Sequence, residues 1–223
     1  MSQSILHQTS WAKSAGGKAI ELFCSEPSTG EPILFVGGVH GDEPEGVRLA
    51  QDLLLWLQKY HRPNWVLIPC LNVDGYASRQ RTNAHGVDLN RNFPCKDWSP
   101  AAKYPRYFPG PKPASEPEVR ALVQLIDKVQ PKLIVHFHSW EACVVYTGTP
   151  GREAAEIIGA GTGYKIAEDI GYPTPGSLGQ YGWLEKKIPV ICVEAQEKSD
   201  LDSVWTIFGP GLRKLLGGGP SDV

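Results

Sequence analysis

The sequence predicts an α/β fold with a mixed, largely parallel central sheet flanked by helices. Short apolar runs of strand type alternate along the chain with longer segments in which apolar residues recur at helical spacing. Such alternation is typical of α/β folds. The 223 residues contain no internal repeat, low-complexity tract or interdomain linker, so we expect a single domain over residues 1–223.

Individual elements follow from local patterns. Four apolar runs predict buried strands at residues 33–36, 65–68, 133–138 and 188–194. Periodic segments predict helices at residues 44–60, 115–129, 152–170 and 201–216. Ser115 and Glu118 can form a capping box, and Gly171 can end the third helix. Residues 72–113 are rich in Asn, Gly, Pro and Arg, which predicts a long loop with a functional role.

Composition excludes several classes of function. The formal net charge of −2 gives no sign of a nucleic-acid surface or a polybasic membrane patch. No apolar run approaches the roughly 20 residues that cross a bilayer, and the N-terminal residues lack the pattern of a signal peptide. The five cysteines are odd in number and have no CxxC spacing, so we expect reduced thiols. These features together predict a cytoplasmic protein.

A candidate metal site begins at His40 and Glu43. This H-x-x-E pair is weak evidence alone, but it stands in a glycine-flanked loop between a predicted strand and a predicted helix. Imidazole nitrogen and carboxylate oxygen are zinc ligands, and a catalytic zinc takes three protein ligands plus an open position. The third ligand must come from a distant segment, and His138 is the candidate.

The choice of third ligand is between His136 and His138. We expect their side chains to point to opposite sides of the strand, so that only one faces the site. His138 is nearer the strand end, which leaves His136 as a core histidine with a satisfied hydrogen bond. His61 and His85 stand in polar contexts and are expected at the surface.

The predicted strand ends bring the candidates together. His40, His138 and Glu194 lie at or just past the ends of three predicted strands. Ligands of open α/β sheets bind in the crevice at the carboxyl ends of the strands. We therefore expect one convergent site, although Glu197 lies close to Glu194 and competes with it.

Several motifs, in order along the chain, resemble those of the zinc carboxypeptidases of the carboxypeptidase A type. Residues 86–94 (GVDLNRNFP) resemble the G-V-D-x-N-R-N-F/W signature of that family. Residues 72–75 (NVDG) resemble its N-P-D-G element, with Val73 in place of proline. The other matches are the arginine-bearing segment 81–83, the pair His138-Ser139, the segment 176–177 that matches the specificity loop, and the segment 193–194 that matches the catalytic glutamate.

The resemblance implies a carboxypeptidase-like fold and one zinc ion per chain, held by His40, Glu43 and His138. It also implies that Glu194 is the general base and that Arg81 stabilises the oxyanion.

Further roles follow from the same resemblance. Asn90 and Arg91 would bind the free carboxylate of the substrate, and Asp88 would orient His40. Ser177 lies in the segment that matches the specificity loop, and Tyr172 is the nearest candidate for the mobile tyrosine that contacts substrate. Without the metal motif, the charged residues of this group would instead indicate a solvated ion-pair network.

The glycine-flanked loops at residues 37–43 and 174–179 look most like those of the bacterial murein peptide amidase branch. That branch cleaves the bond between γ-D-glutamate and meso-diaminopimelate, so the expected partner is a small murein peptide. Three alternatives are a carboxypeptidase acting on ordinary peptides, an N-acyl amino acid deacylase of the succinylglutamate desuccinylase or aspartoacylase type, and an inactive peptidoglycan-binding module.

Overall fold

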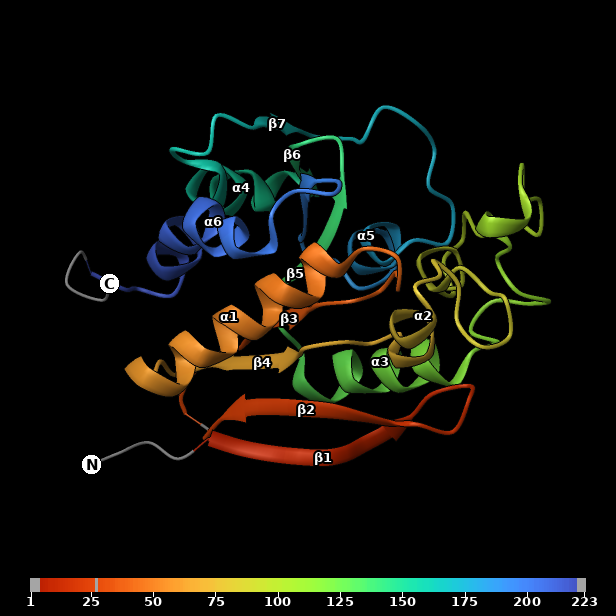
Figure 1. Cartoon of the computed structure of the whole chain (residues 1–223), viewed down its shortest axis with the longest axis horizontal. Helices are drawn as coiled ribbons and strands as arrows, with labels where there is room; N and C mark the ends of the chain where they lie inside the picture. The colour runs from red at the N-terminus through yellow and green to blue at the C-terminus, as the bar shows by residue number, and fades with distance from the viewer. Residues whose placement is uncertain (1–4, 27, 220–223) are drawn as a thin grey trace.

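The computed structural model describes residues 5–26 and 28–219, and its centre is a mixed sheet of eight strands (Figure 1). The strands are β1 (Ile5–Lys13), β2 (Ala19–Ser25), β3 (Ile33–Val36), β4 (Trp65–Ile68), β5 (Leu133–Trp140), β6 (Cys143–Thr147), β7 (Lys165–Ala167) and β8 (Val190–Gln196). The helices are α1 (Pro44–Tyr60), α2 (Val73–Ser78), α3 (Pro117–Val129), α4 (Arg152–Gly159), α5 (Leu178–Gln180) and α6 (Leu201–Leu215). Short helical turns lie at Leu89–Arg91, Pro105–Tyr107, Thr149–Gly151 and Tyr181–Glu185.

The strand order β1-β2-β4-β3-β5-β8-β6-β7 confirms the predicted fold class. The central strands β4, β3, β5 and β8 are mutually parallel. The edges are mixed, since β1 and β2 pair antiparallel with each other, β2 with β4, and β6 with β8. Because the four central strands share one direction, their carboxyl ends meet at one edge of the sheet.

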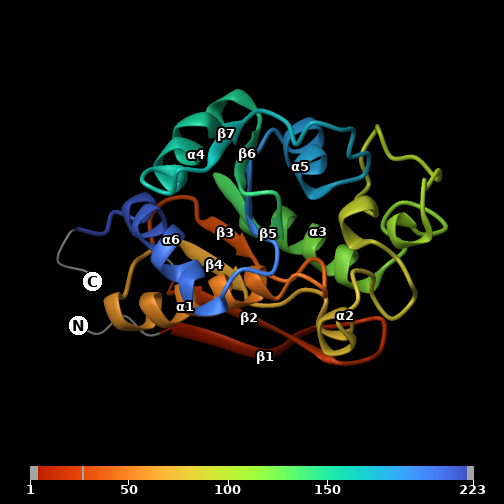
Figure 2. The ribbon, with the colours of Figure 1, turned by 45° about the horizontal axis from the view of Figure 1, so that its top comes forward.

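Two hydrophobic clusters cover the two faces of the sheet. Alternate residues of β3 serve both, with Phe35 in one cluster and Leu34 in the other. Helices α1, α4 and α6 pack on the Phe35 face through side chains such as Leu53 and Phe208. Helix α3 packs on the opposite face through Leu122 and its neighbours (Figure 2). The sheet is therefore buried on both sides, which agrees with the continuous apolar runs of its central strands.

The predicted third helix is too long. Helix α4 ends at Gly159, and residues 165–167 form β7 instead of continuing to Gly171. Gly161 and Gly163 explain the break, because both have positive φ values (80° and 74°) that no right-handed helix contains. The outer strands β1, β2, β6 and β7 were not predicted. Polar residues interrupt the pattern of β1, and β7 has only three residues, whereas the apolar run of β6 was overlooked.

The predicted capping box at the start of α3 is also wrong. Ser115 donates its hydroxyl proton to the carboxylate of Glu116 at 2.7 Å. Glu118 accepts hydrogen bonds from the backbone N–H of Ala15 and the side chain of Asn83. The Ser115 hydroxyl also accepts a hydrogen bond from the side chain of Asn92 at 2.9 Å, and no side-chain cap forms at the start of α3.

Glycines shape the loop that carries His40. Gly38 has φ of +59°, a conformation that L side chains rarely adopt. A Cβ atom on Gly41 would lie 1.9 Å from the carbonyl carbon of Gly75, so only glycine allows this loop to pack against α2.

All five cysteines are free, in agreement with the prediction of reduced thiols. Within residues 5–26 and 28–219, no helix has the length and apolar character needed to traverse a membrane.

Candidate metal centre and active-site cavity

Three side chains of the metal-binding type converge where β3 and β5 end. Nδ1 of His40 lies 2.8 Å from Oε1 of Glu43, and Nδ1 of His138 lies 2.7 Å from Oε2 of the same carboxylate. The two Nδ1 atoms are 3.0 Å apart. His40 follows β3, Glu43 directly precedes α1, and His138 belongs to β5. All three side chains are buried, and their candidate ligand atoms lie within 4.8 Å of one another.

The electrostatics of this cluster keep its carboxylate ionised. Burial raises the pKa of Glu43, but interactions with His40 and His138 outweigh it and hold the pKa well below its usual range. Burial and the Arg81 charge lower the pKa of His40. The neighbouring carboxylates reverse this, and the pKa of His40 is raised overall.

Asp88 ties His40 to Arg81 from beneath the cluster. Its Oδ1 lies 3.1 Å from Nε2 of His40 and accepts the backbone N–H of Asn90 at 2.9 Å. Its Oδ2 accepts Nε–H of Arg81 at 2.8 Å, and Nη1 of Arg81 reaches Oε1 of Glu43 at 3.3 Å. Burial raises the pKa of Asp88, but the charges of Arg81 and His40 lower it well below its ordinary value. A fully buried carboxylate thus holds the imidazole and the guanidinium together.

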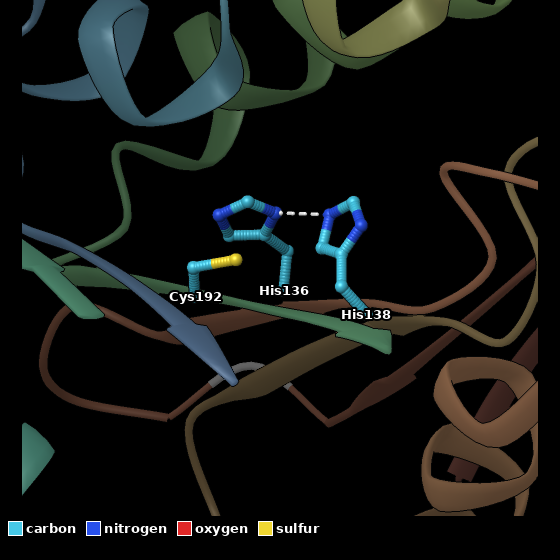
Figure 3. A group of neighbouring side chains, drawn as sticks. All are labelled: His136, His138 and Cys192. Atoms are coloured by element: carbon cyan, nitrogen blue, oxygen red, sulfur yellow. Dashed lines mark hydrogen bonds between the residues drawn. The ribbon is translucent and has the colours of Figure 1, made fainter. Parts of the chain in front are cut away.

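His136 lies beside His138, contrary to the expectation that the two would point to opposite sides of the strand. Residues two apart on a strand share one face, so that expectation is wrong. Nδ1 of His136 is 2.8 Å from Nε2 of His138, and the ring planes are at 89° (Figure 3). His136 is buried and hydrogen-bonded, as expected for a core histidine, but it also lines the cavity described below.

Glu194 stands next to His138 in the register between β5 and β8. Its Oε1 accepts the S–H of Cys192 at 3.1 Å, and its Oε2 is buried without a hydrogen-bond partner among the described residues. Burial raises the pKa of Glu194, the Glu43 charge adds to this, and the pKa is raised overall although His138 opposes it. The competing Glu197 also lines the cavity but is exposed at its rim.

A cavity of about 590 Å³ opens above these groups. Among its lining residues are all the predicted site residues except the fully buried Asp88: His40, Glu43, Arg81, Asn90, Arg91, His138, Tyr172, Ser177 and Glu194. Its volume is in the range of pockets that take small-molecule ligands.

The predicted substrate contacts line the same cavity as the metal cluster. The side-chain oxygen of Asn90 accepts the backbone N–H of Leu178 at 2.9 Å, which ties it to α5. Nη1 of Arg91 donates to the carbonyl of Asn90 at 2.7 Å. Ser177 caps α5, whereas Tyr172 is 46% exposed and contacts the ring of Trp140 edge-on. The exposure of Tyr172 is consistent with a residue that reaches substrate from the rim.

Tyr107 is a cavity residue that sequence reasoning missed. Its ring faces the guanidinium groups of Arg81, Arg91 and Arg106 at 5.1, 6.0 and 5.6 Å. Its only signal in the sequence was its place in the long loop of residues 72–113.

Glu45 was also missed. It is buried in the first turn of α1, where it accepts the Ser139 hydroxyl and the backbone N–H of Lys198, both at 2.7 Å. Its contacts come from distant segments, so no local pattern revealed it.

Two groups of side chains in the described residues are close enough to hold a metal ion. One is His40, Glu43 and His138, and the other is His136, His138 and Cys192. The first is a His₂Glu donor set with a cavity on its open side, which suits a catalytic zinc. In the second, burial and a neighbouring carboxylate raise the pKa of the Cys192 thiol well above its ordinary value, and a protonated thiol is a poor ligand. The residues present therefore fit zinc at the first group.

Comparison with known proteins agrees with this geometry. Residues 3–156 match the zinc carboxypeptidase family, peptidase family M14. Murein peptide amidase A of Escherichia coli K12 is 34% identical over 182 residues, covering 77% of this chain and 74% of that protein. The Vibrio campbellii protein of the same name is 30% identical over 202 residues, covering 85% and 79%. The crystal structure of murein-tripeptide amidase from Escherichia coli O157 superposes with a TM-score of 0.78 at 29% identity, covering 97% and 93%.

The chain belongs to the zinc carboxypeptidase family, because the match covers more than half of it. It is a hydrolase of the metallopeptidase or amidase kind.

Proposed function

We propose that this chain uses one zinc ion to hydrolyse the amide bond between γ-D-glutamate and meso-diaminopimelate in murein peptides. The observation that carries the proposal is a single cavity that combines a His₂Glu donor set with the buried carboxylate Glu194. The similarity to murein peptide amidases over most of their length supports the choice of substrate.

His40, Glu43 and His138 would hold the zinc. When bound, the metal lowers the pKa of a water molecule and polarises the scissile carbonyl. Glu194 removes the proton from the attacking water and passes it to the leaving amine. Its Oε2 suits this role because Oε1 is already occupied by Cys192. Burial raises the pKa of the Glu194 carboxyl and so brings it closer to neutral pH. A pKa near the working pH favours both accepting the proton from water and donating it to the amine.

Arginine side chains supply the positive charge that the reaction needs. Arg81 is held at Nε by Asp88, so its guanidinium is fixed at the cavity wall, where it stabilises the developing oxyanion. Arg91 binds the free carboxylate of the leaving residue, since a planar guanidinium makes paired hydrogen bonds with carboxylates. Asn90 contributes its NH₂ group, because its oxygen is already bonded to the backbone of Leu178.

The test is product analysis with a defined substrate. Zinc-loaded protein is incubated with L-Ala-γ-D-Glu-meso-diaminopimelate, and the products are identified by mass spectrometry. We expect release of diaminopimelate, and a decrease in kcat of at least 100-fold in Glu194→Gln, which keeps the shape of the side chain but removes the base.

Two further substrate panels decide between the alternatives. Zinc-bound protein that leaves the tripeptide intact but removes C-terminal residues from ordinary peptides would reject the murein substrate and keep the carboxypeptidase chemistry. Turnover of N-acyl amino acids alone would indicate a deacylase. No hydrolysis in any panel by zinc-bound protein would contradict the enzymatic proposal itself.

A further inference from the structure

The hydrogen bond between His136 and His138 has no part in the mechanism above. Both rings are buried, and their nitrogen atoms are 2.8 Å apart with perpendicular ring planes (Figure 3). In the pairing of β5 with β8, His136 is opposite Cys192 and His138 is opposite Glu194. His136 and Cys192 therefore form a second cross-strand pair, two residues before the pair of His138 and Glu194 on each strand.

His138 cannot serve both possible metal groups at once. A neutral imidazole offers one lone pair and one N–H, so it ligates through either Nδ1 or Nε2. Its Nδ1 faces the ionised Glu43 carboxylate, whereas its Nε2 faces His136. The third member of the second group, Cys192, donates its S–H to Oε1 of Glu194 at 3.1 Å. This arrangement favours Nδ1 as the atom of His138 that would bind the metal, which leaves Nε2 to carry the proton.

We propose that His136 is a positioning residue, whose Nδ1 accepts the Nε2–H of His138 and so holds the opposite nitrogen of that ring toward the metal. The inference rests on the metal site of the proposed function. His40 has the corresponding support, because its Nε2 faces Asp88. Histidine ligands commonly donate their second N–H in this way, which fixes ring orientation and raises basicity.

His136 is suited to accept this proton. A neutral imidazole has one acceptor nitrogen, and Nδ1 of His136 is the nitrogen that lies 2.8 Å from Nε2 of His138. This ring supports His138 without placing another negative charge in a cluster that already contains Glu43 and Asp88.

The experiment measures zinc affinity by competition with a chromophoric chelator. His136→Leu removes the acceptor at similar volume, whereas His136→Asn keeps an oxygen close to the position of Nδ1. Cys192→Ser is the matched control, since it changes the residue opposite His136 on β8 and leaves the hydrogen bond between His136 and His138 intact. We expect His136→Leu to weaken zinc binding about 10- to 100-fold, and the other two variants to stay near wild type.

The Cys192→Ser control also shows which of the two candidate groups of ligands binds the metal. Weaker zinc binding in Cys192→Ser, equal to that in His136→Leu, would place the metal among His136, His138 and Cys192 and overturn the proposal. Unchanged zinc affinity in His136→Leu would overturn it as well.

A measurement on wild-type protein covers the case in which His136→Leu does not fold. Nitrogen-15 NMR of the zinc-bound form should show His138 protonated at Nε2, with that proton slowed in its exchange with water. Protonation at Nδ1 would overturn the proposal. His40→Ala tests the proposed metal site separately from the role of His136. Undiminished zinc binding in this variant would reject the site itself, and with it this inference.

Discussion

Each histidine of the proposed metal site uses its two ring nitrogens for different tasks. The Nδ1 atoms of His40 and His138 face the Glu43 carboxylate. The Nε2 atoms face Asp88 in one case and His136 in the other. Ring orientation is therefore set by buried partners before any ligand arrives, which lowers the cost of organising the site.

Arg91 leads to a prediction at the same scale. Arg91→Ala should lower kcat/KM for a substrate with a free carboxylate about 10- to 100-fold, because a charge-assisted hydrogen-bond pair is lost. Zinc affinity should not change, since the contacts of Arg91 among the described residues are with the Asn90 carbonyl and the Tyr107 ring and not with the three proposed ligands. Arg106→Ala is the matched control, because Arg106 faces the same Tyr107 ring but is paired with Asp42 at the exposed rim.

A substrate whose carboxylate is converted to an amide completes this test. Wild-type protein should lose activity on the amide, and Arg91→Ala should treat the two substrates nearly alike. If the variant still discriminates between them as strongly as wild type, Arg91 does not bind the carboxylate.

At the scale of elements, the site depends on how closely α1 packs against β5. Gly46 in the first turns of α1 lies over the backbone of β5, where an added Cβ would be 2.4 Å from the carbonyl oxygen of Phe137 and 3.2 Å from the amide nitrogen of His138. Since Glu43 directly precedes α1 and His138 belongs to β5, this approach brings two of the proposed ligands together.

Gly46→Ala should therefore destabilise the protein. Alanine favours helix by about 1 kcal/mol over glycine, but the clash with a backbone carbonyl costs roughly 1–3 kcal/mol because α1 must move away from the sheet. Denaturant unfolding should show a net loss of stability and a weaker affinity for zinc. Gln51→Ala, on the exposed side of the same helix, should leave both unchanged. Equal stability of Gly46→Ala and wild type would show that the helix relaxes without effect.

At the scale of the whole molecule, Asp74 joins the N-terminal hairpin to the body of the fold. Its Oδ2 accepts the backbone N–H of Gly16 at 2.7 Å, and its Oδ1 lies 3.4 Å from Nζ of Lys18. Burial raises the pKa of Asp74, but hydrogen bonds from Ser14, Gly16 and Lys18 outweigh it and lower the pKa below its ordinary value. The segment between β1 and β2 is thereby attached to α2, next to the loop that carries His40.

The lowered pKa predicts a dependence of stability on pH. A carboxyl whose folded-state pKa is below its unfolded value of about 3.9 stabilises the fold above that pH and loses the effect as pH falls through the folded pKa. Asp74→Asn should therefore be less stable than wild type at pH 7, and the difference should shrink below about pH 4. Denaturant unfolding at both pH values measures it, and a difference that does not vary with pH would contradict the prediction.

Local sequence was sufficient for the central strands and for selecting candidate residues that the structure brings to one cavity. The runs at residues 33–36 and 65–68 are β3 and β4 as predicted, because a strand buried on both faces is apolar at every position. The motif at residues 86–94 predicted Asp88 and Arg91 as candidate site residues, and the structure places Asp88 against His40 and Arg91 in the lining of the cavity.

The sequence by itself determined the fold class and the candidate ligands, whereas only the tertiary structure decided how they are supported. The edge strands, the hydrogen bond between His136 and His138, and the burial of Glu45 depend on segments far apart in the chain. Strand register decides which side chains become neighbours, and it is set by packing across the whole sheet. Cys192 lies beside His136 for this reason, although 55 residues separate them in the sequence.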